Sequence, residues 1–319
     1  MMFGSNTLGN GWVVPADDAA ITAATQLLMA GQIVAIPTET VYGLAADAQN
    51  AEAAARIYAA KGRPDFNPLI VHVRDQKAAE KLGVFNATAQ ALAEACWPGP
   101  LTLVLPLQPD APIARAVTAG LPTIAIRCPA HPVMQAMLLK SGLSLAAPSA
   151  NPSGLISPTR ADHVLKGLGG AVPMILDGGS CSAGLESTIV AVRDDGWQIL
   201  RPGPVTSQDI ENMLGYAPLA ATNGFIEAPG QMASHYAPSK PVRLNVIASE
   251  PDVYLIGFGA IAGDDNLSAT GDLAQAAAHL FEALHTADAS AAVSIAVAPI
   301  PHEGIGIAIN DRLARAAVR

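Results

Sequence analysis

Cations, amides and hydroxyls gather in short proline-containing segments of the sequence, where they could bind an anion. The segment K-G-R-P-D-F-N-P-L-I-V-H places Lys61 and Arg63 at the end of an expected helix, with Asn67 and His72 a few residues later. A lysine point charge beside an arginine that can bind two oxygens suits a triphosphate. Two cations at a helix C-terminus also complement its dipole, and a strand histidine usually makes a structural hydrogen bond. This segment alone therefore leaves both interpretations open.

A single arginine stands out in the segment L-P-T-I-A-I-R-C-P, where Arg127 ends an apolar strand. A buried charge without a partner is too costly, so Arg127 must form an ion pair or face a ligand. A substrate that carries a carboxylate is a natural partner. Cys128 follows directly and His131 lies three residues further, but no third member of a nucleophilic triad is evident, so a catalytic thiolate is not expected.

The segment A-P-S-A-N-P-S-G-L-I-S-P-T offers neutral donors from Ser149, Asn151 and Ser157 between prolines and a glycine. Such a loop can hold phosphate oxygens without adding charge. It is not a Walker loop, because G-x-x-x-x-G-K-[ST] is absent from the sequence.

Three further segments place polar side chains near strand ends. Thr40 lies in P-T-E-T-V-Y-G-L, Ser187 in G-L-E-S-T-I-V and Arg201 in I-L-R-P-G. Hydroxyls at a strand end can bind a small polar ligand, although a capped turn explains the threonines equally well. Each of these segments is a weak signal by itself.

Short helices that alternate with short apolar strands must position these segments, a pattern typical of an α/β fold. Asp17 is expected to cap a helix that ends at Gly31. Further helices are expected at 51–60, 88–96, 132–141, 159–165 and 207–214, and strands at 33–36, 69–73, 101–105, 123–127, 174–177, 187–192 and 197–200.

The chain divides into three parts. Residues 1–215 form the first domain, and residues 216–241, rich in Pro, Gly and Ala and without periodicity, form a linker. Residues 242–319 form a small α/β domain with strands at 243–247, 253–257 and 294–297 and helices at 273–285 and from Asp311. His235 and Tyr236 in the linker make an inert tether less expected than a functional segment.

Composition limits the classes of function. Half of the 319 residues are hydrophobic, and the formal net charge is −9, which disfavours stable binding of a nucleic-acid backbone. Three cysteines without metal-ligand spacing indicate reduced thiols. The first residues lack a basic n-region, and no apolar stretch is long enough for a membrane span, so we expect a cytoplasmic protein that uses no membrane.

In their order, the motifs P-T-E-T-V-Y-G-L, K-G-R-P-x-x-N-P-L, W-P-G-P-L-T, R-C-P-x-H-P, A-P-S-A-N-x-S-G, G-L-E-S-T-I-V and L-R-P-G resemble the YrdC-like threonylcarbamoyl-adenylate synthase family. The segment P-G-Q-M-A-S-H-Y-A-P and the sequence after it resemble the long, two-domain form. The resemblance implies an α/β fold: a twisted open sheet with helices around a concave, positively charged cavity, followed by a small Rossmann-like domain.

The resemblance also implies an activity. L-threonine, bicarbonate and ATP would give threonylcarbamoyl-AMP, pyrophosphate and water, the first step of the threonylcarbamoyladenosine modification beside the tRNA anticodon. Magnesium is expected with the ATP, with no metal site of the protein's own. A separate threonylcarbamoyl transferase complex would complete the pathway, so the chain need not bind tRNA stably.

The residue roles that the resemblance implies fall into three groups. Lys61 and Arg63 would be catalytic, near the phosphates. Threonine would contact Thr40, His72, Arg127, Ala147 and Ser187. ATP would contact Arg63, Asn67, Thr123, Ser149, Asn151, Ser157, Arg201 and His235. The family's linker commonly carries basic residues where this chain has Ala233 and Ser234, which puts the linker's electrostatic contribution in question.

Two other functions compete with this interpretation. A carbamoyl-adenylate-forming enzyme would use carbamoyl phosphate, but the zinc-finger and acylphosphatase modules that accompany such domains are absent. A non-enzymatic RNA-binding module would use the concave surface, but the net charge of −9 and the small number of aromatic residues argue against it.

Overall fold

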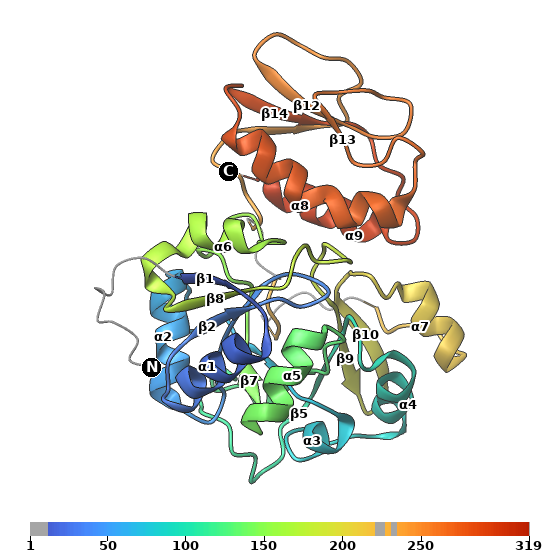
Figure 1. Ribbon diagram of the computed structural model, residues 1–319. Helices are drawn as coiled ribbons and strands as arrows, with labels where there is room; N and C mark the ends of the chain where they lie inside the picture. The colour runs from blue at the N-terminus through green and yellow to red at the C-terminus, as the bar shows by residue number, and fades with distance from the viewer. Residues whose placement is uncertain (1–11, 221–226, 231–234, 319) are drawn as a thin grey trace.

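The computed structural model describes residues 12–220, 227–230 and 235–318, which form two α/β domains (Figure 1). A mixed ten-stranded sheet organises the first domain, in the order β1-β8-β2-β3-β7-β4-β6-β5-β9-β10. Its strands are β1 (Trp12–Pro15), β2 (Val34–Ile36), β3 (Gly43–Asp47), β4 (Ile70–His72), β5 (Leu101–Pro106), β6 (Thr123–Arg127), β7 (Leu145–Ala146), β8 (Met174–Asp177), β9 (Thr188–Arg193) and β10 (Gly196–Arg201).

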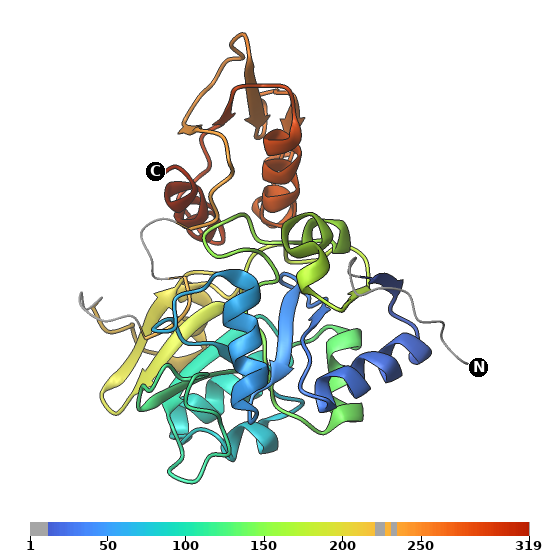
Figure 2. The same cartoon turned by 90° about the vertical axis from the view of Figure 1, so that its left-hand side faces the viewer.

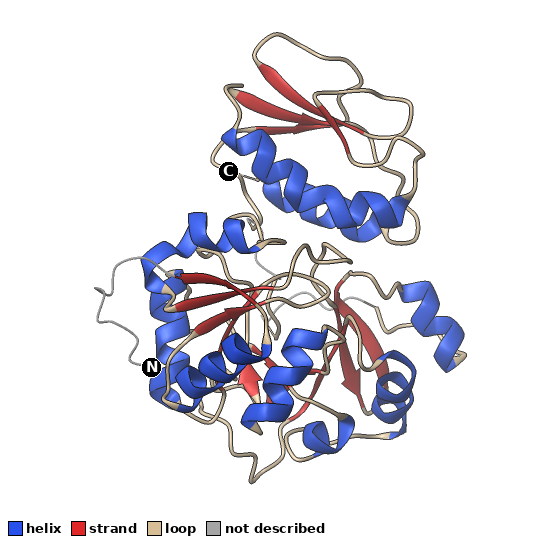
Figure 3. Ribbon diagram, viewed as in Figure 1, coloured by secondary structure: helices blue, strands red, loops and turns tan. Residues whose placement is uncertain are grey.

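Seven α-helices of the described residues surround this sheet (Figure 3). They are α1 (Asp18–Met29), α2 (Ala51–Lys61), α3 (Gln76–Glu80), α4 (Ala87–Cys96), α5 (Pro132–Ser141), α6 (Ala161–Leu168) and α7 (Ser207–Leu214). On one face, Ile57 of α2 and Leu92 of α4 pack against Leu103 and Ile126 in the main core. On the other face, α1 and α5 cover the strands β1, β8, β2, β3 and β7.

The remaining part of that second face is where the sheet can hold a ligand. Side chains alternate between faces along a strand, so Ile70 and His72 of β4 point away from the main core, which contains Val71. Arg127 of β6 follows the same alternation and lies opposite His72 in register. Among the described residues, no helix packs on this small apolar cluster, whereas Ala228 of the linker does. The alternation therefore places polar strand ends on a helix-free face.

The second domain contains four parallel strands in the order β11-β14-β12-β13. The strands are β11 (Val242–Leu244), β12 (Val253–Gly257), β13 (Asp265–Asn266) and β14 (Ser294–Val297), and the helices are α8 (Leu273–Ala289) and α9 (Gly306–Ala316). Both helices lie between this sheet and the first domain in Figures 1 and 2. A Cβ on Gly184 would meet the Ala278 backbone of α8 at 2.4 Å, so glycine permits this close approach.

The predicted α/β class is confirmed, and most predicted elements are present within one to three residues of their expected ends. Asp17 caps α1 by accepting from Ala20 N, and Gly31 is left-handed with φ of +73°. The pattern did not predict β1, β3, α3, β7 or β13, which are two to five residues long. The last helix begins at Gly306 instead of Asp311. Among the described residues, no helix is long and apolar enough to cross a membrane.

Candidate active site

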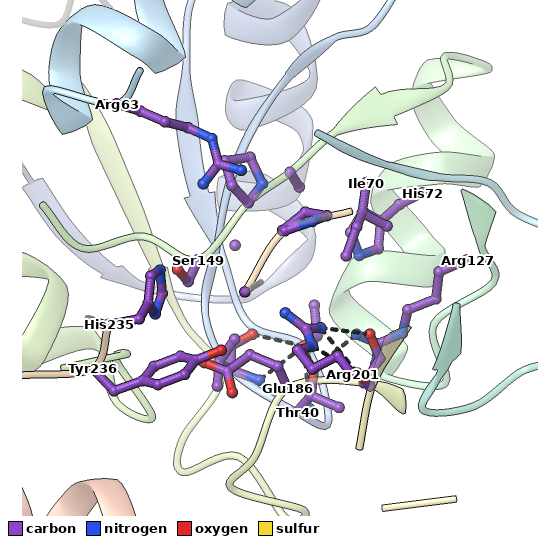
Figure 4. A pocket seen from close by; sticks show the side chains of 18 residues that line it. Thr40, Arg63, Ile70, His72, Arg127, Ser149, Glu186, Arg201, His235 and Tyr236 are labelled. Atoms are coloured by element: carbon purple, nitrogen blue, oxygen red, sulfur yellow. Dashed lines mark hydrogen bonds between the residues drawn. The ribbon is translucent and has the colours of Figure 1, made fainter. Parts of the chain in front are cut away.

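A cavity with an empty volume of about 530 Å³ opens on the helix-free face of the first sheet (Figure 4). Its lining combines strand ends, two loops and the linker. Of the residues predicted from the sequence, the cavity is lined by Thr40, Arg63, His72, Arg127, Ala147, Ser149, Ser187, Arg201 and His235. It is also lined by Thr38, Val41, Gly43, Ile70, Pro148, Glu186, Pro229, Gly230 and Tyr236. Segments distant in sequence therefore meet at one site.

Arg127 lies at one end of the cavity and is held on three sides. It donates from Nη1 to Thr40 Oγ1 at 2.7 Å and from Nε to Gly99 O at 3.1 Å. Nη2 forms an ion pair with Glu39 Oε1 at 2.7 Å. Thr38 shares a 2.8 Å hydrogen bond with the Thr40 hydroxyl, which fixes that contact in turn. The guanidinium thus has a defined orientation before any substrate arrives.

Glu39 was not among the residues predicted from the sequence, although Arg127 was expected to need a partner. Burial alone would raise the Glu39 pKa, but the adjacent Arg127 charge and hydrogen bonds outweigh burial and lower it. Glu39 is therefore an anion at neutral pH. The signal that could have identified it is the acidic residue of P-T-E-T, next to the predicted ligand Thr40.

His72 faces the same end of the cavity as a neutral imidazole. Burial, and then the Arg127 charge, lower the His72 pKa to about 3. Its Nδ1 is buried and has no hydrogen-bond partner among the residues that the structure describes. A buried polar atom without a partner is costly, and a bound polar group at this position would remove that cost.

Arg63 lies at another part of the cavity wall, positioned by the end of α2. Gly62 ends the helix in the left-handed conformation, with φ of +59°, and directs the chain toward the cavity. Arg63 donates from Nε to Asn67 O at 3.1 Å and from Nη2 to Asn67 Oδ1 at 2.7 Å. Burial lowers the Arg63 pKa to about 10, so it remains a cation at neutral pH. Asn67 orients Arg63 and is not itself part of the lining.

Lys61 lies behind the cavity wall and does not line the cavity. Its ammonium nitrogen donates to the backbone carbonyls of Ser149 and Asn151, and so holds the 149–151 loop. Burial, and then the charge of Arg63, lower the Lys61 pKa well below its ordinary value. The structure therefore places Lys61 where it shapes the loop that carries Ser149.

Three more predicted ATP contacts lie outside the lining. Asn151 donates from Nδ2 to Pro152 O and Leu155 O, at 3.0 and 2.7 Å, within its own loop. The Ser157 hydroxyl donates to Glu186 Oε1. Thr123 shares the sheet face of Arg127, but it begins β6 and is about 13 Å further along the strand.

Arg201 and Ser187 are neighbours in the cavity wall. Arg201 donates from Nη2 to Ser187 O at 2.9 Å and to Ser187 Oγ at 3.2 Å. The Ser187 hydroxyl also shares a 2.7 Å hydrogen bond with Thr102 Oγ1 of β5. Among the lining residues that the structure describes, Arg63, Arg127 and Arg201 are three arginines, and Glu186 is the single carboxylate. The cavity is basic although the whole chain is acidic, and this favours anionic ligands.

The linker contributes His235 and Tyr236, which lie across the cavity from His72 and Arg127 (Figure 4). Ala237 N donates to Gly154 O at 2.9 Å, which ties the linker to the first domain. Burial is the main cause that lowers the His235 pKa to about 3, so this imidazole is also neutral. Ala233 and Ser234, which stand where the family's linker commonly carries basic residues, lie outside the described residues.

Other reactive groups are poor candidates for catalysis. The thiols of Cys96, Cys128 and Cys181 are free, and burial raises the pKa of Cys128 to about 11. Cys128 donates its S–H to Arg74 O at 3.2 Å, so it is a thiol and not a thiolate. Within residues 12–220, 227–230 and 235–318, no cluster of three or more His, Cys, Asp or Glu side chains could hold a metal ion.

Known families, proteins and solved structures resemble this chain over most of its length. The Sua5–YciO–YrdC family model, described as "Telomere recombination", matches residues 26–203, and a model described as "Threonylcarbamoyl-AMP synthase, C-terminal domain" matches residues 205–318. The threonylcarbamoyl-AMP synthase of Bacillus subtilis is 40% identical to this chain, over 94% of each sequence. That of Pyrococcus abyssi is 36% identical, over 93% of this chain and 94% of the relative. A crystal structure of P. abyssi Sua5 complexed with L-threonine has a TM-score of 0.87 and 34% identity, and covers 96% of both chains.

The fold, the basic cavity and these relatives define an enzyme of the nucleotidyltransferase type that makes an adenylate. The family predicted from the motifs is confirmed. The chain belongs to the threonylcarbamoyl-AMP synthase family, in its two-domain form.

Proposed function

We propose that this chain condenses L-threonine, bicarbonate and ATP to threonylcarbamoyl-AMP, the first step of tRNA threonylcarbamoyladenosine synthesis. The observation that carries the proposal is a single cavity with two differently built ends. Arg127 and neutral His72 suit a small amino acid, whereas Arg63, Arg201 and the Ser149 loop suit a polyphosphate. The carbamoyl-adenylate and RNA-binding alternatives are not favoured, since the relatives over the whole chain are threonylcarbamoyl-AMP synthases.

The reaction proceeds in two balanced steps. The threonine amine attacks bicarbonate, forming a C–N bond and losing water, to give N-carboxythreonine. A carboxylate oxygen of this carbamate then attacks the α-phosphorus of ATP in line, and the bond to the pyrophosphate oxygen breaks. Positioning and charge neutralisation supply most of the catalysis, because phosphoryl and nucleotidyl transfer need little covalent help from the protein.

At the threonine end, Arg127 binds the substrate carboxylate while Thr40 and Ser187 bind through their hydroxyls. The orphan Nδ1 of His72 receives a polar group of threonine, and the Ala147 backbone lies close by. Because the His72 pKa is near 3, its imidazole stays neutral and does not protonate the attacking amine. An amine must be unprotonated to attack, so a neutral neighbour suits this chemistry.

At the nucleotide end, Arg63 and Arg201 take up charge on the phosphate oxygens, and Ser149 donates its hydroxyl. Lys61, Asn67, Asn151 and Ser157 act from behind this wall, by holding Arg63, the 149–151 loop and Glu186. The family resemblance implied that Lys61 lies near the phosphates. The contacts of its ammonium favour loop support, with a phosphate contact only if the loop rearranges. Thr123 extends the same sheet face toward the base, and His235 covers the nucleotide from the linker.

Magnesium enters with ATP as part of the substrate. Both carboxylates near the cavity are already engaged: Glu39 with Arg127 and Glu186 with Arg312. Ligands for the ion therefore come mainly from phosphates and water, which matches the preference of Mg²⁺ for few protein ligands. When bound, the ion neutralises charge on the leaving pyrophosphate.

The linker supplies a cover for a reactive intermediate. A carbamate loses carbon dioxide readily, so exclusion of water favours the second step. We assign residues 1–215 to the catalytic domain, 216–241 to this lid and 242–319 to the domain that supports it. The product is handed to a threonylcarbamoyl transferase, and we assign the enzyme to the cytoplasm, where its three free thiols remain reduced.

The proposed function is tested by pyrophosphate release from purified protein supplied with ATP and Mg²⁺. Release should require threonine and bicarbonate together, and carbamoyl phosphate should not replace them. Pyrophosphate release driven by carbamoyl phosphate without threonine would favour the carbamoyl-adenylate alternative instead. A salt titration of tRNA binding separates the enzyme from an RNA-binding module, for which tight binding at low salt is expected.

A further inference from the structure

An arginine of the second domain, to which the sequence assigned no role, contacts the cavity wall. Arg312 of α9 is fully buried between the domains. It donates from Nε to Glu186 Oε2 at 2.8 Å and from Nη2 to Pro202 O at 3.0 Å, both in the first domain. Its Nη1 donates to Asp311 Oδ2 at 2.7 Å, within α9. A fully desolvated guanidinium with three fixed acceptors has a defined position.

The partner of Arg312 is Glu186, which is the only carboxylate among the described residues that line the cavity. Burial alone would raise the Glu186 pKa, but Arg312, and then Arg201 and the Ser157 hydrogen bond, lower it, so Glu186 is ionised. Without Arg312, this anion would remain buried beside a site that must accept a polyphosphate. The Glu186 carboxylate would repel the phosphates. It would also compete with them for Arg201, the second cation whose charge acts on Glu186.

Arg312 also supports the linker. Its guanidinium lies over the Tyr236 ring, with Cζ 5.1 Å from the ring centroid, which is within cation–π range. Phe281 of α8 packs on the same ring, with 5.6 Å between centroids. The backbone of Tyr236 is left-handed, with φ of +63°, a strained conformation for a bulky residue. Such strain persists only where surrounding contacts impose it, and α8 and α9 supply them.

We propose that Arg312 is a positioning residue for the nucleotide end of the active site: it neutralises Glu186 and holds Tyr236, and with it His235, against the cavity. The second domain thereby completes the electrostatics of a site whose substrate contacts lie elsewhere. This inference rests on the proposed binding of ATP at the end formed by Arg63 and Arg201. It predicts that loss of Arg312 weakens ATP binding far more than threonine binding.

A simple interdomain tether would behave differently. A buried ion pair that only joins domains can often be replaced by apolar side chains without loss. Removal of only one partner of such a pair would lower thermal stability, or would affect the binding of both substrates alike. A neutralising role predicts instead that removing the Glu186 charge restores what the loss of Arg312 removes, whereas a packing role predicts no restoration.

The test uses the full-length protein and its threonine- and bicarbonate-dependent pyrophosphate release. We expect Arg312→Met to raise the KM for ATP by about tenfold or more, with the KM for threonine changing by less than about threefold. The double variant Arg312→Met, Glu186→Gln should recover most of the loss. Arg243→Met, which removes an exposed arginine of the same domain paired with Glu250, is the matched control and should resemble the wild type.

The outcomes that overturn the inference are distinct from failure of the proposed function. An unchanged KM for ATP in Arg312→Met, or a double variant no better than Arg312→Met, contradicts the role of Arg312 while wild-type turnover still supports the activity. If Arg312→Met does not fold, Arg312→Gln offers a polar substitute, which removes the charge and replaces the three guanidinium contacts with one shorter amide donor. The KM for ATP should then rise to a similar extent, and a wild-type value would contradict the inference.

Discussion

Arg127 Nη2 lies 2.7 Å from Glu39 Oε1, so the arginine assigned to the substrate carboxylate is already paired with a carboxylate of the protein. The pair fixes the guanidinium, together with the bonds to Gly99 O and Thr40 Oγ1. It also leaves this end of the cavity close to neutral. A zwitterionic amino acid fits such an end better than a polyanion does, which separates it from the end formed by Arg63 and Arg201.

Arg127→Gln tests this division of the cavity. It should weaken threonine binding by about 100-fold, because a charge-assisted pair in a buried site is lost. Isothermal titration with threonine, and with ATP, gives both affinities, and the ATP affinity should change by less than about threefold. Glu39 would be left without its partner, so Glu39→Gln is added to restore stability. Arg74→Gln, which removes an exposed arginine paired with Asp75, is the control. Equal loss of both ligands would contradict the division.

Lys61→Met tests loop support. The methionine fills a similar volume but cannot donate to the carbonyls of Ser149 and Asn151. Two buried acceptors lose their donor, so we expect a loss of about 2 kcal/mol in the free energy of unfolding. Pyrophosphate release should fall by at least about tenfold as Ser149 moves. Lys77→Met on α3 provides the control. Wild-type turnover by a folded Lys61→Met protein would argue against the role of Lys61.

His235→Ala tests whether the linker contacts the nucleotide. The imidazole is nearly buried at the cavity wall, on the side away from His72. Its loss should raise the KM for ATP by about tenfold, as expected for removal of one buried polar contact. The KM for threonine should stay within about threefold of the wild type. His302→Ala, at an exposed histidine of the second domain, is the control. A rise in the KM for threonine without a rise in the KM for ATP would contradict the assignment of His235 to the nucleotide end.

Buried neutral histidines predict the pH dependence of stability. Burial lowers the pKa values of His72, His163 and His235 to about 3, against an ordinary value of 6.5. Between these pH values the unfolded chain binds protons that the folded chain does not. Their stabilising contribution is therefore complete above about pH 6.5 and declines as the pH falls toward 3, by up to about 1.4 kcal/mol per pH unit for each histidine.

Denaturant unfolding between pH 5 and pH 7 measures this slope. Glu39 and Glu186, whose pKa values are lowered, remain ionised in the folded protein throughout this window and add to the slope only near pH 5, where unfolded glutamates begin to bind protons. His163 stacks on His285 of α8, with 3.8 Å between ring centroids, so the effect includes the domain interface. His163→Gln should reduce the slope by the contribution of up to one bound proton, about 1.4 kcal/mol per pH unit. Stability that does not change, or that rises, as the pH falls through this window would contradict these pKa values.

The sequence predicted which residue types form the site better than it predicted the contacts between distant segments that position them. Arg127 was predictable because a strand-end arginine needs a partner, and the alternation along β4 and β6 puts it beside His72. Lys61 was predicted at the phosphates because its sequence neighbours suggested that role. Its contacts with the 149–151 loop depend on how a helix end meets a loop about 90 residues away. No local pattern encodes such a pairing.

The contribution of the second domain was the least predictable part. Arg312 lies in an amphipathic helix, where an arginine normally indicates a solvated face. Only the packing of α9 on the first domain shows that it is buried against Glu186, 126 positions earlier. The strands missed from the pattern, such as β3 and β7, have the same origin: short Ala- and Gly-containing segments become strands because their neighbours pair with them.

In the proposed reaction, one cavity joins threonine, bicarbonate and the adenylate of ATP. The most direct measurement is mass spectrometry of the product formed with ¹³C-bicarbonate, threonine and Mg-ATP under conditions that trap the labile adenylate. The proposed reaction should give a species with the mass of AMP joined to N-carboxythreonine with loss of water, carrying one ¹³C. A product without the label, or one that forms only when carbamoyl phosphate replaces bicarbonate, would contradict it.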